Sequence, residues 1–326
     1  MASEGLVFVH ISKAGGSNFY NQFFTAYTQK YAPRRYWKEH GLAYSKHVWP
    51  FQQQLTMVRG SPRQHLWSMY GECRYTKWGL RITRDLEFPR TGSATDGFER
   101  WTRHFCTDLQ GAHTDTSWRY GCYHPSNYQT RALTSNSSEP HGIEEDPAAP
   151  NVKLAVDALR HNLSWFGVTE FFDASVCLFM GAIAGSPPEA PLPENISAYV
   201  DQKCRCDDGS RGRGSASSGS SSSIANYVSH IPVEAAFPHA LDPAGANELG
   251  AAGQTCLEKL TATDTKMVRH AVQIFLKRIV LFEQKLGRRV LCDNVLQKQQ
   301  PLMTDTFDNV TQLYYASKAY WEQLSK

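Results

Sequence analysis

The sequence predicts an α/β fold in which a central parallel sheet is flanked by helices, within one chain of 326 residues. Strand-like and helix-like segments alternate through the first half of the chain, as such a sheet requires. The apolar run Val7-Phe8-Val9 also leads through a turn containing Gly15-Gly16 into a helical pattern. This order of strand, turn and helix forms the first unit of the predicted sheet.

The expected elements follow one another along the chain. Short apolar runs predict strands over residues 6–11, 43–49, 55–59 and 163–168. Apolar residues at helical spacing predict helices over residues 16–31, 62–75, 97–107, 125–133, 150–161, 171–184 and 263–286. Pro33 ends the first helix, Pro62 suits the first turn of the second, and Gly287 ends the last.

We expect a single domain over residues 1–326. Residues 205–223 are predicted to form a disordered Gly/Ser-rich insertion, because the stretch 209–223 contains only Gly, Ser, Arg and Ala and cannot bury a core. Residues 261–326 are expected to form a C-terminal helical part, which begins near the long helix 263–286.

Charge and composition narrow the class of protein. With 34 basic against 31 acidic residues, the net charge of +3 is too mild to indicate a nucleic-acid partner. No apolar run is long enough to span a membrane, so we expect no membrane span in this chain. The first strand begins by residue 6, which is consistent with an N-terminal anchor missing from the sequence. The oligomeric state is not predicted.

Eight cysteines and four N-glycosylation triplets suit a protein of the secretory pathway. The cysteines are too scattered for a zinc site, and the close pair Cys204 and Cys206 has the wrong spacing for one, so we expect no metal. Disulfides fit this number of cysteines, but their pairing stays open. The glycosylation triplets begin at Asn136, Asn162, Asn195 and Asn309.

The segment Lys13-Ala14-Gly15-Gly16-Ser17-Asn18 is the first candidate binding site. Adjacent glycines let backbone N–H groups approach an anion, and the helix that follows points its positive end at the same place. Lys13 adds a full positive charge. The lysine precedes the glycines, whereas in the P-loop of NTPases it follows them, which weakens an NTPase interpretation. The alternative is an ordinary turn between a strand and a helix.

Arg59 is the second candidate, at the carboxyl end of the strand 55–59, which is the edge where open parallel sheets bind ligands. Its planar guanidinium can hold a phosphate through two hydrogen bonds, and Ser68 in the next helix adds a hydroxyl. The alternative is a solvated charge at a strand end.

Together these segments resemble the nucleotide-binding segments of carbohydrate sulfotransferases that use 3′-phosphoadenosine 5′-phosphosulfate (PAPS), such as the Golgi enzymes that sulfate heparan or chondroitin. Residues 10–17 are similar to the loop P-K-T-G-G-T of that family, and residues 59–70 to its segment R-D-P-x-x-R-x-x-S-x-Y. Residues 127–133, Asn-Tyr-Gln-Thr-Arg-Ala-Leu, resemble its helix N-x-Q-T-R-x-L. Residues 166–175 resemble its strand and helix V-G-x-T-E-x-F-D-x-S.

The resemblance implies a three-layer P-loop NTPase-like fold, location in the Golgi lumen, and transfer of a sulfuryl group from PAPS to a carbohydrate hydroxyl. It implies that Lys13 stabilises the leaving group and that the 5′-phosphosulfate lies against Ala14, Gly15, Gly16, Ser17 and Asn18. Arg59, Arg63 and Ser68 would bind the 3′-phosphate. The sequence departs from the family at Ser12 and Ala14, and it carries one extra residue between Arg59 and Pro62.

The resemblance also implies a histidine general base, for which His47 is the best match and His40 the runner-up. His40, Gln129 and Arg131 are expected to line the substrate pocket. Glu170 is interpreted as a helix cap at a strand end. A P-loop kinase or NTPase and a non-catalytic glycan-binding protein stay open as alternative functions.

The sequence does not identify the acceptor. Five basic residues form either a track for an anionic polysaccharide or a solvated loop surface. They are Arg74, Lys77, Arg81, Arg84 and Arg90.

Overall fold

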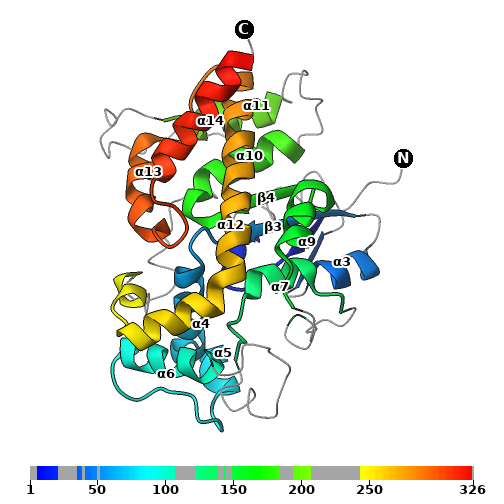
Figure 1. The fold of residues 1–326 in the computed structure, drawn as a ribbon. Helices are drawn as coiled ribbons and strands as arrows, with labels where there is room; N and C mark the ends of the chain where they lie inside the picture. Colours follow the sequence, from blue (N-terminus) through cyan, green and yellow to red (C-terminus); the bar gives the residue numbers. More distant parts are fainter. Residues whose placement is uncertain are drawn as a thin grey trace, which may run out of the picture.

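The computed structural model describes residues 6–20, 35–38, 41–49, 52–106, 122–137, 143, 149–183, 194–206 and 243–324. These residues form an α/β protein with a small parallel sheet and mostly helices (Figure 1). Most of the Gly/Ser-rich insertion predicted over 205–223 lies outside the described residues.

The described sheet has four parallel strands in the order β2-β1-β3-β4. They are β1 (Leu6–Val9), β2 (Arg35–Lys38), β3 (Gln53–Val58) and β4 (Trp165–Val168). Every residue of β1 and β4 is buried, as expected for a parallel sheet that is covered on both faces. In the register Phe8 lies beside Leu55, and Leu55 lies beside Trp165. The carboxyl ends of β1, β3 and β4 therefore share one edge of the sheet.

The strand predicted over residues 43–49 is wrong, because this segment forms the helix α3 (Leu42–Val48). Its buried side chains, Leu42 and Ser45, are three residues apart and share one face of that helix. The run was too short for its periodicity to separate the two states. The second strand of the sheet is instead β2, which the sequence did not predict.

Most of the other predicted elements are present. Pro62 occupies the first turn of α4, and the Ser61 side chain caps that helix by accepting a hydrogen bond from the Gln64 N–H at 3.2 Å. Only the first turn of the helix predicted over 16–31 lies within the described residues. The predicted helices of the first part are α1 (Gly16–Phe19), α4 (Pro62–Tyr75), α6 (Ala94–Cys106), α7 (Tyr128–Thr134), α9 (Val152–Asp157) with a π-helical turn η3 (Ala158–Asn162), and α10 (Phe172–Ile183) after a 3₁₀ turn η4 (Thr169–Phe171).

Other helices were not predicted individually. They are α5 (Lys77–Ile82), α11 (Glu194–Lys203) and the 3₁₀ turn η6 (Pro243–Asn247), together with α13 (Asp293–Gln299), η7 (Gln300–Met303) and α14 (Val310–Leu324) of the C-terminal helical part. The last three fall within the helical part predicted over 261–326.

The long helix α12 (Ala251–Leu286) begins twelve residues before its predicted start at 263, and it bends near that point (Figure 1). Asn127 enters its hydrogen-bond ladder at the bend. The Asn127 N–H donates to the Leu260 carbonyl at 2.8 Å, and Asn127 Oδ1 accepts from the N–H groups of Thr263 at 2.7 Å and Asp264 at 3.1 Å. A side chain inserted into the ladder is a known cause of a helix kink.

Asp264 returns the contact by capping the N-terminus of α7. One of its carboxylate oxygens accepts from the Thr130 N–H and hydroxyl, both at 2.7 Å, and the other accepts from the Gln129 N–H at 3.2 Å. The carboxylate is fully buried, and burial raises its pKa from 3.8 to about 6 despite these bonds. Thr263 and Asp264 looked like the start of a helix because residues of these types cap helices, but Asp264 caps a different one.

Four disulfides join distant parts of the described chain, and they resolve the pairing left open by the sequence. The pairs are Cys73–Cys122, Cys106–Cys256, Cys177–Cys204 and Cys206–Cys292. Cys106–Cys256 fastens α6 to α12, while Cys204 and Cys206 take separate partners. This number of disulfides fits a secreted or lumenal protein. Among the described residues, no helix is both long and apolar enough to cross a membrane.

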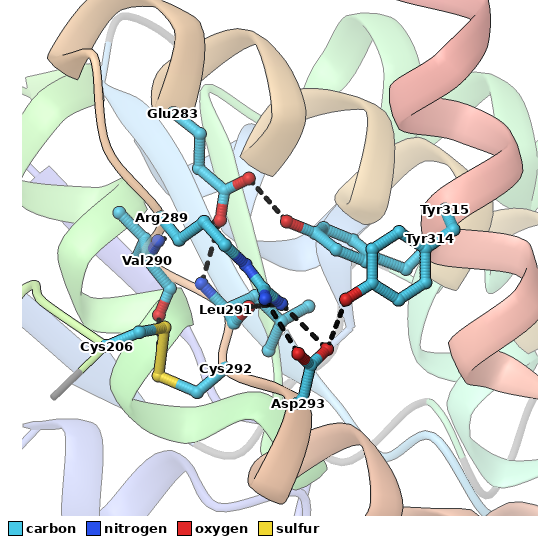
Figure 2. Close-up of a disulfide and its surroundings, with 9 residues drawn as sticks. All are labelled: Cys206, Glu283, Arg289, Val290, Leu291, Cys292, Asp293, Tyr314 and Tyr315. Carbon is cyan, nitrogen blue, oxygen red and sulfur yellow. Dashed lines mark hydrogen bonds and ion pairs between the residues drawn. A yellow bond between two sulfur atoms is a disulfide. The ribbon is translucent and has the colours of Figure 1, made fainter. Parts of the chain in front are cut away.

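Glu283 organises the turn that follows α12 (Figure 2). Its buried carboxylate accepts from the N–H groups of Val290 at 2.7 Å and Leu291 at 2.9 Å, and from the Tyr314 hydroxyl at 2.6 Å. Beside it, the Arg289 guanidinium forms two bonds with the Asp293 carboxylate, at 2.8 and 2.9 Å. These contacts hold α13 and α14 against the end of α12, next to the disulfide Cys206–Cys292.

Asp264→Asn is expected to change how stability depends on pH. Because the pKa of Asp264 is raised in the folded state, the group favours folding below its unfolded pKa of 3.8, and this advantage is lost as the pH rises through about 6. The loss amounts to about 3 kcal/mol for a shift of this size. Asparagine does not titrate. Urea unfolding is measured at about pH 4 and about pH 7. The free energy of unfolding of wild type should exceed that of the variant by more at the lower pH. An equal difference at both pH values would contradict the assignment.

Candidate functional site

The loop after β1 and the loop after β3 meet at the carboxyl edge of the sheet. We call loop 12–18 and loop 59–63 together the candidate anion site. The Arg59 guanidinium donates from Nη1 to the Lys13 carbonyl at 3.2 Å, so the two cations that the sequence singled out are neighbours. Thr169, directly after β4, places its hydroxyl 2.6 Å from the Ala14 carbonyl and 3.1 Å from the Val58 carbonyl. The ends of three strands therefore contribute to one place.

The glycines of loop 12–18 are required by its geometry. Gly15 has a φ of +77°, a left-handed conformation that glycine adopts without steric cost. At Gly16 a Cβ atom would lie 2.2 Å from Cδ2 of the His10 ring, far closer than any real contact. Lys13 also has a positive φ, 62°, which is uncommon for a residue with a side chain. No side chain caps the N-terminus of α1 within the described residues.

Gln129 forms two hydrogen bonds with the backbone of Arg59. Its side-chain amide accepts from the Arg59 N–H at 2.7 Å and donates to the Arg59 carbonyl at 3.1 Å, and Gln129 is fully buried. The segment Asn127–Leu133 thus contacts the predicted anion-binding arginine directly. Arg131 is buried on the same short helix and donates from Nε to the Ser126 carbonyl at 3.1 Å. That these two residues line a substrate pocket stays a prediction.

The Lys13 side chain forms an ion pair that the sequence did not indicate. Its Nζ lies 2.8 Å from Oε2 of Glu72, in the third turn of α4, and both side chains are about one-fifth exposed. A carboxylate at this distance stabilises the charged ammonium and restricts where it points. Glu72 is 59 residues from Lys13 along the chain, so no local pattern could identify it.

Carboxylates anchor loop 59–63, including the extra residue. Glu170, a buried residue two positions after the end of β4, accepts from the N–H of Gly60 at 2.5 Å and of Ser61 at 3.2 Å. Asp305 accepts from the Ser61 hydroxyl at 3.1 Å and from the Arg63 N–H at 3.0 Å. Burial raises the pKa of both carboxyl groups, while the nearby Arg59 charge lowers that of Glu170. The donors at the start of α4 are thus already bonded within the protein.

His65 holds loop 12–18 through a hydrogen bond to its backbone. It is fully buried on α4, and its Nε2 lies 2.6 Å from the Ser12 carbonyl. A carbonyl only accepts, so Nε2 carries the proton. Burial lowers the pKa of His65 to about 3, with smaller contributions from the charges of Arg59 and Lys13. This histidine is therefore neutral at physiological pH and acts as a fixed hydrogen-bond donor.

The other predicted site residues are not all at this edge. His47 lies between Ser45 and Trp49, which bond the Gln54 side chain at the start of β3, the opposite end of that strand from Arg59. Ala14 is buried, Asn18 and Ser68 are half-buried, and Ser17 and His47 are exposed, with His47 in the last turn of α3. The Arg63 guanidinium pairs with Glu258 of α12 at 3.1 Å. His40 lies outside the described residues. No group of three or more His, Cys, Asp or Glu side chains among the described residues could hold a metal ion.

Two of the five residues of the predicted basic track form hydrogen bonds within the protein. Arg74 is buried and donates to the carbonyls of Gly92 at 2.7 Å and Ser93 at 2.8 Å. Arg90 donates to the Thr83 hydroxyl. The members of the track that remain exposed are Lys77, Arg81 and Arg84.

Comparison of this chain with protein-family models, curated proteins and solved structures found no match. Its class is therefore defined by its own geometry: an α/β protein with two basic loops joined at the carboxyl edge of a parallel sheet.

Gly16→Ala is expected to destabilise the protein by about 2 kcal/mol or more, because its Cβ overlaps the buried His10 ring and overpacking is costly. Gly287→Ala is the matched control. Gly287 has a left-handed φ of +65° at the end of α12 but nothing within 4 Å of its Cβ, so backbone strain alone should cost about 1 kcal/mol. Thermal and urea unfolding of both variants measure the difference. Equal losses would mean that His10 does not pack beneath the loop.

Proposed function

We propose that this protein is a sulfotransferase that moves a sulfuryl group from PAPS to a hydroxyl of a carbohydrate. The observation that carries the proposal is the contact between Arg59 and the Lys13 loop, because it joins two predicted anion-binding segments that are 46 residues apart. The resemblance of four segments, in order, supports the same reading and a three-layer P-loop NTPase-like fold. The four disulfides are compatible with the Golgi lumen as its location.

The donor groups of the candidate anion site fit a nucleotide with two separate anionic groups, such as PAPS. Lys13, the uncapped start of α1 and the left-handed turn at Gly15 would hold the 5′-phosphosulfate. Arg59 would hold the 3′-phosphate through its side chain, with Arg63 and Ser68 nearby on α4. The backbone N–H groups of Gly60, Ser61 and Arg63 are bonded to carboxylates, so we do not assign them to the nucleotide.

PAPS supplies an activated sulfuryl group, and the chain's own residues then have two tasks. Lys13 stabilises negative charge on the departing phosphate, and Glu72 holds its ammonium in place until the nucleotide binds. A base must take the proton of the acceptor hydroxyl, and we assign this role to His47. This assignment comes from the resemblance, since in the structure His47 lies on α3 near the start of β3, exposed but not beside the candidate anion site.

One observation favours a second candidate, a glycan-binding protein without catalysis. Carboxylates of Glu170 and Asp305 take the N–H groups at the start of α4, which is a natural position for an anion. A chain that had lost its nucleotide site would tolerate this arrangement. Sulfate transfer to any glycan by the purified protein would exclude this candidate.

Lys13→Ala and Arg59→Ala are each expected to weaken binding of adenosine 3′,5′-bisphosphate, the product nucleotide, by about tenfold or more, because each removes a charge-assisted bond. Isothermal titration calorimetry in the absence of metal measures the affinity. Lys77→Ala removes an exposed lysine on α5 and serves as the control for overall charge. Unchanged affinity in both site variants would overturn the proposal.

His47→Ala is expected to reduce sulfate transfer by about a hundredfold or more while binding of adenosine 3′,5′-bisphosphate is retained, since a base acts on the acceptor and not on the nucleotide. Transfer from labelled PAPS to a panel of desulfated glycans provides the assay. Glu72→Gln is measured in parallel. If His47→Ala leaves transfer unchanged, His47 is not the base; a loss in Glu72→Gln alone shows that Lys13 needs its partner.

A further inference from the structure

Glu170 connects the two loops of the candidate anion site. Its carboxylate accepts from the N–H groups of Gly60 and Ser61, and Oε1 lies 3.8 Å from Nε of Arg59. Nη1 of Arg59 in turn donates a hydrogen bond to the Lys13 carbonyl. A continuous path of polar contacts therefore runs from the end of β4, through the loop after β3, to the loop after β1.

We propose that Glu170 is a positioning residue of the candidate anion site, which sets the direction of the Arg59 guanidinium and, through it, the conformation of loop 12–18. The identity of the ligand in this proposal rests on the proposed function; the structural coupling does not. The sequence interpretation of Glu170 as a cap for the helix that follows it is replaced, because its carboxylate accepts hydrogen bonds from Gly60 and Ser61 in the loop before α4.

The direction of Arg59 matters because its donors are divided between the protein and a ligand. Nε faces Glu170 and Nη1 donates to the Lys13 carbonyl. Among the described residues Nη2 has no hydrogen-bond partner, so this end of the guanidinium is the part that can meet an anion. Nη1 is held by its hydrogen bond and Nε is buried beside the Glu170 charge without a hydrogen bond, so the planar group presents Nη2 outward.

A negatively charged group is needed at position 170. Among the described residues, the carboxylate faces donors, which include the N–H groups of Gly60 and Ser61 and the Arg59 cation. Glutamine has the same shape, but its NH₂ group would face a donor or the cation, and a buried polar group without a partner is costly. The uncharged side chain also loses its attraction for Arg59.

Gly60, in the loop that carries the extra residue, lies close to this carboxylate. A Cβ atom at Gly60 would lie 2.7 Å from Oε2 of Glu170 and 2.8 Å from Cε of Met303. Any side chain at Gly60 would thus displace Glu170 or the segment that contains Met303. The loop can pass close to Glu170 because position 60 is a glycine.

The test compares Glu170→Gln with Glu283→Gln. Glu283 is a matched control, because it is also a buried glutamate that accepts two backbone N–H groups, but in the turn after α12 (Figure 2). Amide hydrogen exchange is followed in loop 12–16, loop 59–63 and the turn 288–292. Affinity for adenosine 3′,5′-bisphosphate is measured for both variants, and for Glu170→Gln combined with Arg59→Ala.

Glu170→Gln should increase exchange in both loop 12–16 and loop 59–63, and Glu283→Gln only in the turn 288–292. We expect Glu170→Gln to weaken nucleotide binding by about tenfold, Glu283→Gln to leave it unchanged, and Glu170→Gln to have no further effect once Arg59 is alanine. Unchanged exchange in loop 12–16, or an equal loss of affinity with and without Arg59, overturns the inference.

The exchange measurement separates this inference from the proposed function. Wild-type protein that does not bind the nucleotide counts against the sulfotransferase, while exchange in loop 12–16 still decides the role of Glu170. If Glu170→Gln does not fold, Gly60→Ala takes its place, because its Cβ pushes directly on the Glu170 carboxylate. Gly60→Ala must then increase exchange in loop 12–16, and failure to do so overturns the inference.

Discussion

The pair of hydrogen bonds between the Gln129 amide and the backbone of Arg59 is the contact on which the arrangement at the sheet edge depends. Gln129 is itself held because Asp264 of α12 caps the helix that carries it. Asn127 in turn fixes the bend of α12 at the point where Asp264 lies. The longest helix of the molecule is thereby connected to the end of β3, and the position of Arg59 depends on packing far from the sheet.

Three carboxylates balance the positive charges of this region: Glu170 is buried, Glu72 is half-buried and Glu258 is exposed. Glu72 pairs with Lys13, Glu170 faces Arg59, and Glu258 pairs with Arg63. Without such partners, several cations close together would repel one another and destabilise the folded state. With them, an anion that enters must compete with internal carboxylates for the same cations. An anion that binds here as proposed would need enough charge to displace these carboxylates from the cations.

Much of the sheet could be predicted from sequence, and the partners of the site residues could not. The strands β1, β3 and β4 are short runs of buried apolar residues, and Pro62 marks the start of α4. Arg59 was identifiable because it directly follows β3, and Lys13 because it lies in the glycine-containing turn after β1. The contacts of Glu72 and His65 with loop 12–18 span 59 and 53 residues, so they depend on tertiary structure that no local pattern encodes. The capping of α7 by Asp264 also depends on tertiary structure. Because Asp264 is a typical first residue of a helix, the predicted start of α12 was wrong.

The disulfide Cys106–Cys256 fastens the first turns of α12, on the other side of its bend from Asp264. The two sides of the bend are therefore held by different means, one by a covalent bond to α6 and the other by hydrogen bonds to α7. Helix α12 carries both Cys256, which forms this disulfide, and Asp264, which supports the sheet edge through α7. Formation of the disulfide and the order of the sheet edge are therefore linked. Protein made in a reducing cytosol would lack the covalent half of this support, so production in an oxidising compartment is the appropriate route to material with an ordered Arg59 loop.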